Sequence, residues 1–129
     1  MGKAKSALRS QERAFERIKR VIEKALRVCE GRGLELEGVY LVGSRARGDY
    51  LEDSDADLVL IVRGVEGLNA LQRMELFKDS LEPNVELLIY TPEEWRSSDS
   101  AWITELRREA KKICGKYDSR KCLKSMEQL

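Results

Sequence analysis

The run Leu58–Val62 (LVLIV) restricts the fold of this chain more than any other stretch, because five consecutive apolar residues leave no polar face. A strand with one solvated face alternates apolar and polar residues, whereas an uninterrupted apolar run is typical of a strand that is covered on both faces. We therefore expect a central strand here, with a layer packed on each of its faces.

Helical and extended patterns alternate along the rest of the chain. Apolar residues recur at spacings of three and four from about Ser10 to Glu30, which predicts an amphipathic helix that ends at the following glycines. Short apolar runs at 39–42 and 85–90 predict two more strands. Helices are expected after Gly67, from Pro92, and from Trp102 to Gly115, the first two opening with capping-box spacing.

This order predicts an α/β (α+β) fold, α-β-α-β-α-β-α, with a small mixed three-stranded sheet flanked by helices. The helix between the strands at 58–62 and 85–90 has the length of a crossover and predicts that they are parallel, while the strand at 39–42 pairs antiparallel with 58–62. We expect one domain over residues 1–115 and a polar tail over 116–129.

Composition excludes several kinds of site. The chain has no His, so zinc sites with His ligands and nucleophiles activated by His are excluded. Lys plus Arg (24) nearly balance Asp plus Glu (23). No signal peptide or membrane-length apolar run is visible, and we expect a cytoplasmic protein. Cys29 and Cys114 read as core residues on helix faces, and Cys122 lies in the polar tail.

Acidic residues precede the central strand. Asp55 and Asp57 are two residues apart, so an extended backbone points both carboxylates to one face. Glu86, inside the next strand, can complete a three-carboxylate group suited to Mg²⁺. A calcium loop is excluded because the required positions carry Leu58 and Gly64. The simpler alternative is a solvated acidic turn.

The segment from Gly43 to Arg47, here called the corner, precedes these acids and has a different chemistry. Gly43 permits close backbone approach or positive φ, and Ser44 adds a hydroxyl and backbone N–H groups for phosphate. Arg45 and Arg47 add cationic donors to the same corner. A phosphate-type corner together with a carboxylate group indicates a site for Mg²⁺ and a nucleoside triphosphate.

Gly43 and Ser44, ten further residues, then Asp55, Ala56 and Asp57 before an aliphatic strand resemble the signature of the DNA polymerase β-like nucleotidyltransferase superfamily. The resemblance is greatest to its minimal nucleotidyltransferase branch, whose small members often act beside HEPN-domain partners as toxin and antitoxin.

This resemblance implies transfer of a nucleoside monophosphate, AMP from ATP, to a hydroxyl with release of pyrophosphate. It also implies two Mg²⁺ ions held by Asp55, Asp57 and Glu86, and phosphates held by Gly43, Ser44 and an arginine at 45 or 47. The superfamily commonly has Asp where this chain has Glu86, so Glu86 is expected either on the metal or toward the acceptor as general base.

Two other functions also fit this sequence. One is an antitoxin-like interaction protein that binds and neutralises a partner with weak or no catalysis, and the last helix is a candidate surface for a partner or a homodimer. The other is a nucleic-acid-binding module, suggested by nine Lys or Arg against three Glu in the first 27 residues. Their interleaving along the helix is more typical of a solvated face.

Overall fold

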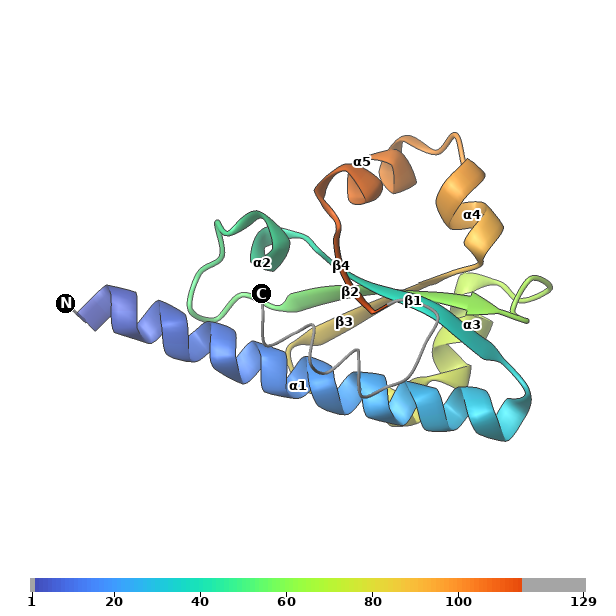
Figure 1. Ribbon diagram of the computed structural model, residues 1–129, viewed down its shortest axis with the longest axis horizontal. Helices are drawn as coiled ribbons and strands as arrows, with labels where there is room; N and C mark the ends of the chain where they lie inside the picture. The colour runs from blue at the N-terminus through green and yellow to red at the C-terminus, as the bar shows by residue number, and fades with distance from the viewer. Residues whose placement is uncertain (1, 115–129) are drawn as a thin grey trace.

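The computed structural model describes residues 2–114, in which a mixed sheet lies between two layers of helices (Figure 1). The elements in chain order are α1 (Gly2–Arg32), β1 (Glu35–Val42), α2 (Ser44–Arg47), β2 (Ala56–Arg63), α3 (Ala70–Leu76), the 3-10 helix η1 (Lys78–Ser80), β3 (Val85–Tyr90), α4 (Pro92–Ser97), α5 (Ala101–Glu109) and β4 (Lys111–Cys114). The predicted tail at 116–129, which includes Cys122, lies outside the described residues.

The sheet has the strand order β3-β2-β1-β4. β2 pairs antiparallel with β1 and parallel with β3, as the sequence predicted. The apolar run of β2 is fully buried, because Leu58, Val59, Leu60 and Val62 are 0% exposed and Ile61 is 4% exposed. The prediction of a central strand covered on both faces is therefore confirmed.

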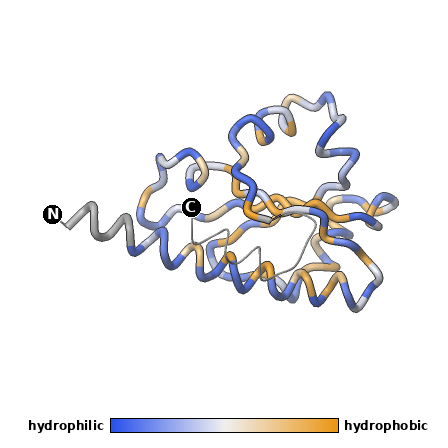
Figure 2. The backbone as a smooth tube through the Cα atoms, viewed as in Figure 1, coloured by the Kyte–Doolittle hydropathy of each residue, from blue (hydrophilic) through white to orange (hydrophobic). Residues whose placement is uncertain are grey.

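Each face of the sheet has its own apolar core. Leu58, Leu60 and Val62 pack with α1 on one face, and Val59 and Ile61 pack with residues of α4 and α5 on the other. Figure 2 shows hydrophobic residues concentrated in the strands, while hydrophobic and hydrophilic residues alternate along the part of α1 that is drawn in colour. Because side chains alternate along a strand, Asp57 points to the face of Val59 and Ile61, under α5.

The expected sheet of three strands is wrong by one strand. We predicted a last helix that continued to Gly115, but α5 ends at Glu109 and β4 pairs antiparallel with the outer side of β1. The apolar positions Leu106, Ala110 and Ile113 also fit a helix, so the local pattern could not separate the two. The free edge of β1, which is distant in sequence, decides the outcome, and Cys114 lies on a strand rather than a helix.

The other predicted elements are present with shifted ends. α1 begins at Gly2 rather than near Ser10, and β1 begins at Glu35 rather than Val39. Cys29 is buried in the core as predicted, and burial, followed by the charge of Glu30, raises the pKa of its thiol to about 11. Within residues 2–114, no helix combines the length and the apolarity needed to cross a bilayer.

Candidate active site

The corner after β1 has its shape because of a glycine. Gly43 adopts φ 75°, and its carbonyl accepts hydrogen bonds from the N–H groups of Ala46 and Arg47, both at 3.0 Å, to close the single turn of α2. A Cβ at Gly43 would lie 2.5 Å from Oδ2 of Asp57. The backbone of the corner therefore lies against the carboxylate of Asp57, and a side chain at position 43 would require both a strained positive φ and a shift of that carboxylate.

The sheet register brings two predicted acids together. Asp57 of β2 is paired with Glu86 of β3 in the parallel ladder, so their carboxyl groups lie side by side. Burial, then the charges of Glu86 and Asp55, raise the pKa of Asp57 to about 6. Two carboxyl groups in such contact share a proton or need a cation, so this pair is poised to bind positive charge.

Asp55 lies next to this pair without completing it. It precedes β2 and is close enough to raise the pKa of Asp57, but it does not line the adjacent pocket. In the described part of the chain, no three His, Cys, Asp or Glu side chains are grouped so as to hold a metal ion. Mg²⁺ commonly binds one or two protein carboxylates together with substrate phosphates, and the Asp57–Glu86 pair fits that requirement.

A pocket of about 500 Å³ joins the corner to the acids. This volume is within the range of small-molecule sites. Five of the seven predicted site residues line it, namely Gly43, Ser44, Arg47, Asp57 and Glu86. Cationic, hydroxyl and carboxylate groups thus face one space.

Arg45 is not brought to this pocket. The residue is 5% exposed, and its guanidinium donates to Ser10 Oγ at 2.8 Å, Gln11 Oε1 at 2.9 Å and the carbonyl of Ser54 at 2.8 Å. It also lies 4.5 Å from the centre of the Tyr50 ring. Arg45 therefore ties the β1–β2 connection to α1, and of the two predicted arginines only Arg47 faces the pocket.

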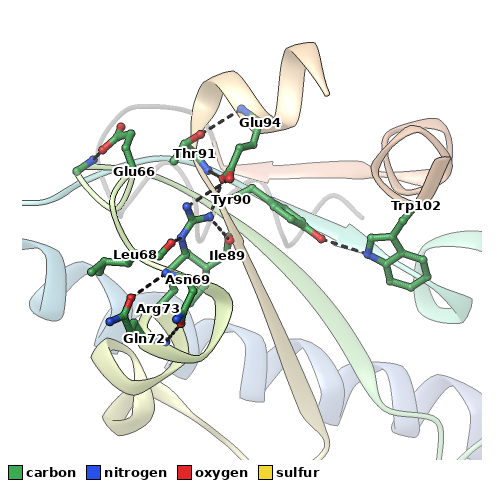
Figure 3. Close-up of polar contacts among 11 residues, drawn as sticks. Glu66, Leu68, Asn69, Gln72, Arg73, Ile89, Tyr90, Thr91, Glu94 and Trp102 are labelled. Carbon is green, nitrogen blue, oxygen red and sulfur yellow. Dashed lines mark hydrogen bonds and ion pairs between the residues drawn. The ribbon is translucent and has the colours of Figure 1, made fainter. Parts of the chain in front are cut away.

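α5 adds two residues to the site, Glu109 and Trp102, that were not among the predicted site residues. Glu109 accepts a hydrogen bond from the Gly43 N–H at 2.8 Å and pairs with Arg47 at 2.7 Å. Trp102 is 60% exposed at the pocket wall, and its indole N–H donates to the Tyr90 hydroxyl at 3.1 Å (Figure 3). Both occupy ordinary positions of an amphipathic helix, and only the packing of α5 over the corner distinguishes them.

Comparisons with known proteins bear on the family and the fold of this chain. The sequence model of the family described as "Nucleotidyltransferase domain" matches residues 18–113. The chain is similar to the crystal structure of a candidate nucleotidyltransferase from Sulfolobus solfataricus, with 30% identity and a TM-score of 0.69 over 89% of this chain and 92% of that one. A toxin-antitoxin structure with AMP-PNP is more distant, with 17% identity and a TM-score of 0.46 over 82% and 84% of the two chains. A comparison with curated protein sequences finds no match.

Proposed function

The chain belongs to the nucleotidyltransferase domain family, and we propose that it transfers a nucleoside monophosphate from a nucleoside triphosphate to a hydroxyl group. The acceptor oxygen bonds to the α-phosphorus, the bond from that phosphorus to the α–β bridging oxygen breaks, and pyrophosphate leaves. The observation that carries the proposal is the contact of the Gly43 backbone with the Asp57 carboxylate, which puts phosphate-binding and cation-binding groups side by side.

Each of the five predicted site residues that line the pocket has a role in the proposed reaction. Gly43, Ser44 and Arg47 bind the β and γ phosphates, since backbone N–H, hydroxyl and guanidinium groups all donate to phosphate oxygens. Asp57 and Glu86 face the α-phosphate. Glu86 also accepts the proton of the attacking hydroxyl, a role that requires a carboxylate within hydrogen-bond reach of that hydroxyl. Arg45 takes no part in binding phosphate.

Magnesium fits the same residues. Asp57 and Glu86 supply hard oxygen ligands, and Asp55, whose charge also acts on Asp57, is the further carboxylate that the family resemblance implies for a second ion. When bound, Mg²⁺ lowers the pKa of the attacking hydroxyl and neutralises charge on the leaving pyrophosphate. We propose ATP as the donor and a hydroxyl of a HEPN-domain partner protein as the acceptor, both on the basis of the resemblance.

Two labels of ATP test the reaction. With Mg²⁺ and the proteins that co-purify with the chain, [α-³²P]ATP should label an acceptor and [γ-³²P]ATP should not. Asp57→Asn should reduce labelling about 100-fold or more, since a lost metal ligand removes several kcal/mol of transition-state stabilisation. Mass spectrometry of the acceptor should show the added mass of AMP.

Asp53→Asn is the matched control, because it makes the same change at an exposed turn residue outside the pocket. It should label at the parent rate. Full labelling by Asp57→Asn would contradict the assignment of the site, and labelling from the γ-phosphate would indicate phosphoryl transfer instead.

The second candidate function is binding and neutralisation of a partner protein. It is favoured by one observation, the 60% exposure of Trp102 on α5, because large exposed aromatic side chains are typical of protein interfaces. If Asp57→Asn still binds and silences a co-purifying partner while Trp102→Ala does neither, binding is the main role.

A further inference from the structure

Glu109 occupies two of the three groups that the proposed function assigns to phosphate, the Gly43 N–H and the Arg47 guanidinium. Its Oε1 accepts from the Gly43 N–H at 2.8 Å, and its Oε2 accepts from Nη1 of Arg47 at 2.7 Å. The side chain comes from the last residue of α5, 66 positions after Gly43, and is 22% exposed. One carboxylate thus spans a backbone donor and a cationic donor from two different elements.

A carboxylate and a phosphate present the same chemistry to these donors. Both are oxyanions that accept two hydrogen bonds across a pair of oxygens. A single N–H that donates at 2.8 Å to Glu109 has no second hydrogen for a phosphate oxygen. The two anions therefore exclude each other at Gly43, and their charges repel if both remain near Arg47.

We propose that Glu109 is an internal competitor for the phosphate corner, holding Gly43 and Arg47 in the nucleotide-free protein and leaving them when a triphosphate binds. The inference rests on the proposed function for the identity of the ligand. While Glu109 holds the Gly43 N–H and the Arg47 guanidinium, the corner keeps the shape that binds phosphate. Rotation of the Glu109 side chain is then enough to free both donors for the nucleotide.

A structural role for Glu109 predicts the opposite effect on affinity. If Glu109 only held the corner in shape, its removal would loosen Gly43 and Arg47 and weaken nucleotide binding. As a competitor, its removal strengthens binding, because the nucleotide no longer has to break two charge-assisted hydrogen bonds. The sign of the change in affinity therefore separates the two roles.

Isothermal titration calorimetry should measure the Kd of two probes: Mg·ATP, and inorganic tripolyphosphate as a probe of the corner alone. Glu109→Gln and Glu109→Ala should each lower the Kd for both probes about tenfold, the size expected for one released charge-assisted hydrogen bond. Glu105→Gln is the matched control: Glu105 lies one turn earlier on α5 and lines the same pocket, but pairs with Arg108 rather than with the corner. It should change Kd less than about threefold.

Weaker binding in both Glu109 variants, or an equal gain in Glu105→Gln, would overturn the inference and leave the proposed function standing. Tighter tripolyphosphate binding in the Glu109 variants without any nucleotidyl transfer by the parent would support the inference and contradict the function. Absence of binding of either probe to the parent and all variants would contradict both.

Discussion

Asp57 faces Gly43 across the corner and Glu86 across the β2–β3 ladder, so two neighbours restrict its chemistry. Burial of Asp57, the charge of Glu86 and the charge of Asp55, in that order, raise the pKa of Asp57 to about 6. The protonated form is thus favoured in the folded protein at a pH where a solvated aspartate is ionised. A bound cation would reverse this preference.

In metal-free protein, Glu86→Gln should lower the pKa of Asp57 without restoring its ordinary value, because burial remains the largest cause. The raised pKa means that the folded state keeps a proton that the unfolded state releases between pH about 4 and about 6. This carboxyl therefore makes the free energy of unfolding fall as pH rises through that window, and the variant should show a smaller fall.

Carboxyl ¹³C NMR with a chelator present measures the pKa, and urea unfolding at pH 4 and pH 7 measures the slope. Glu75→Gln, an exposed substitution on α3 outside the pocket, should leave both unchanged. A parent Asp57 that titrates near pH 4 would refute the explanation.

The acidic part of the site could be predicted because it depends on the alternation of side chains along a strand and on the register of β2 with β3. The spacing of Asp57 and Glu86 in two strands joined by a crossover was enough to place them together. The positions of the Arg45 and Glu109 side chains could not be predicted from the sequence, since each contacts a partner more than 30 residues away. In a sequence, a buried loop arginine cannot be distinguished from a solvated one unless the helix that packs on it is known.

At the scale of elements, α3 and α4 are held together by one carboxylate. Glu94 accepts from the Thr91 N–H in the capping box of α4 and pairs with Arg73 of α3 at 2.6 Å (Figure 3). Arg73 is 6% exposed and also donates to the carbonyls of Leu68 and Ile89. The capping spacing was legible in the sequence and is confirmed, whereas the pairing with Arg73 needed the packing of the two helices.

Glu94→Gln should destabilise the fold by about 2 kcal/mol, because it leaves the buried guanidinium of Arg73 without its counter-charge while the amide preserves part of the cap. Glu93→Gln makes the same change on the neighbouring exposed position and should stay within about 0.5 kcal/mol. Denaturant unfolding compares the two, and equal losses would show that general charge on α4, rather than the ion pair, matters.

At the scale of the whole molecule, α1 runs along one face of the sheet and is fastened to the site region by Arg45 (Figure 1). The same guanidinium bonds the carbonyls of Glu52 and Ser54, just before Asp55. Helix, connection and strand start are therefore one hydrogen-bonded unit. The missed strand β4 lies on the opposite side of β1 from β2 and leaves this unit unchanged.

Arg45→Met should lower the free energy of unfolding by about 2–4 kcal/mol, since it removes one buried and two part-buried hydrogen bonds. Amide hydrogen exchange should accelerate most in residues 50–55, where the connection loses its tie to α1. Arg108→Met, at a side chain that is 74% exposed, should cost less than about 0.5 kcal/mol. Similar losses in the two variants would contradict the role given to Arg45.

The fastening by Arg45 also has a consequence for protein design. The segment from Gly43 to Asp57 reads as a portable motif, yet its buried arginine is completed by Ser10 and Gln11, which belong to a different part of the chain. A designer who grafts the motif into another α/β scaffold must therefore supply matching acceptors on the covering helix, or replace Arg45 with an apolar side chain that fills the same space. Without one of these, the graft would carry the acids but not the support that holds them in place.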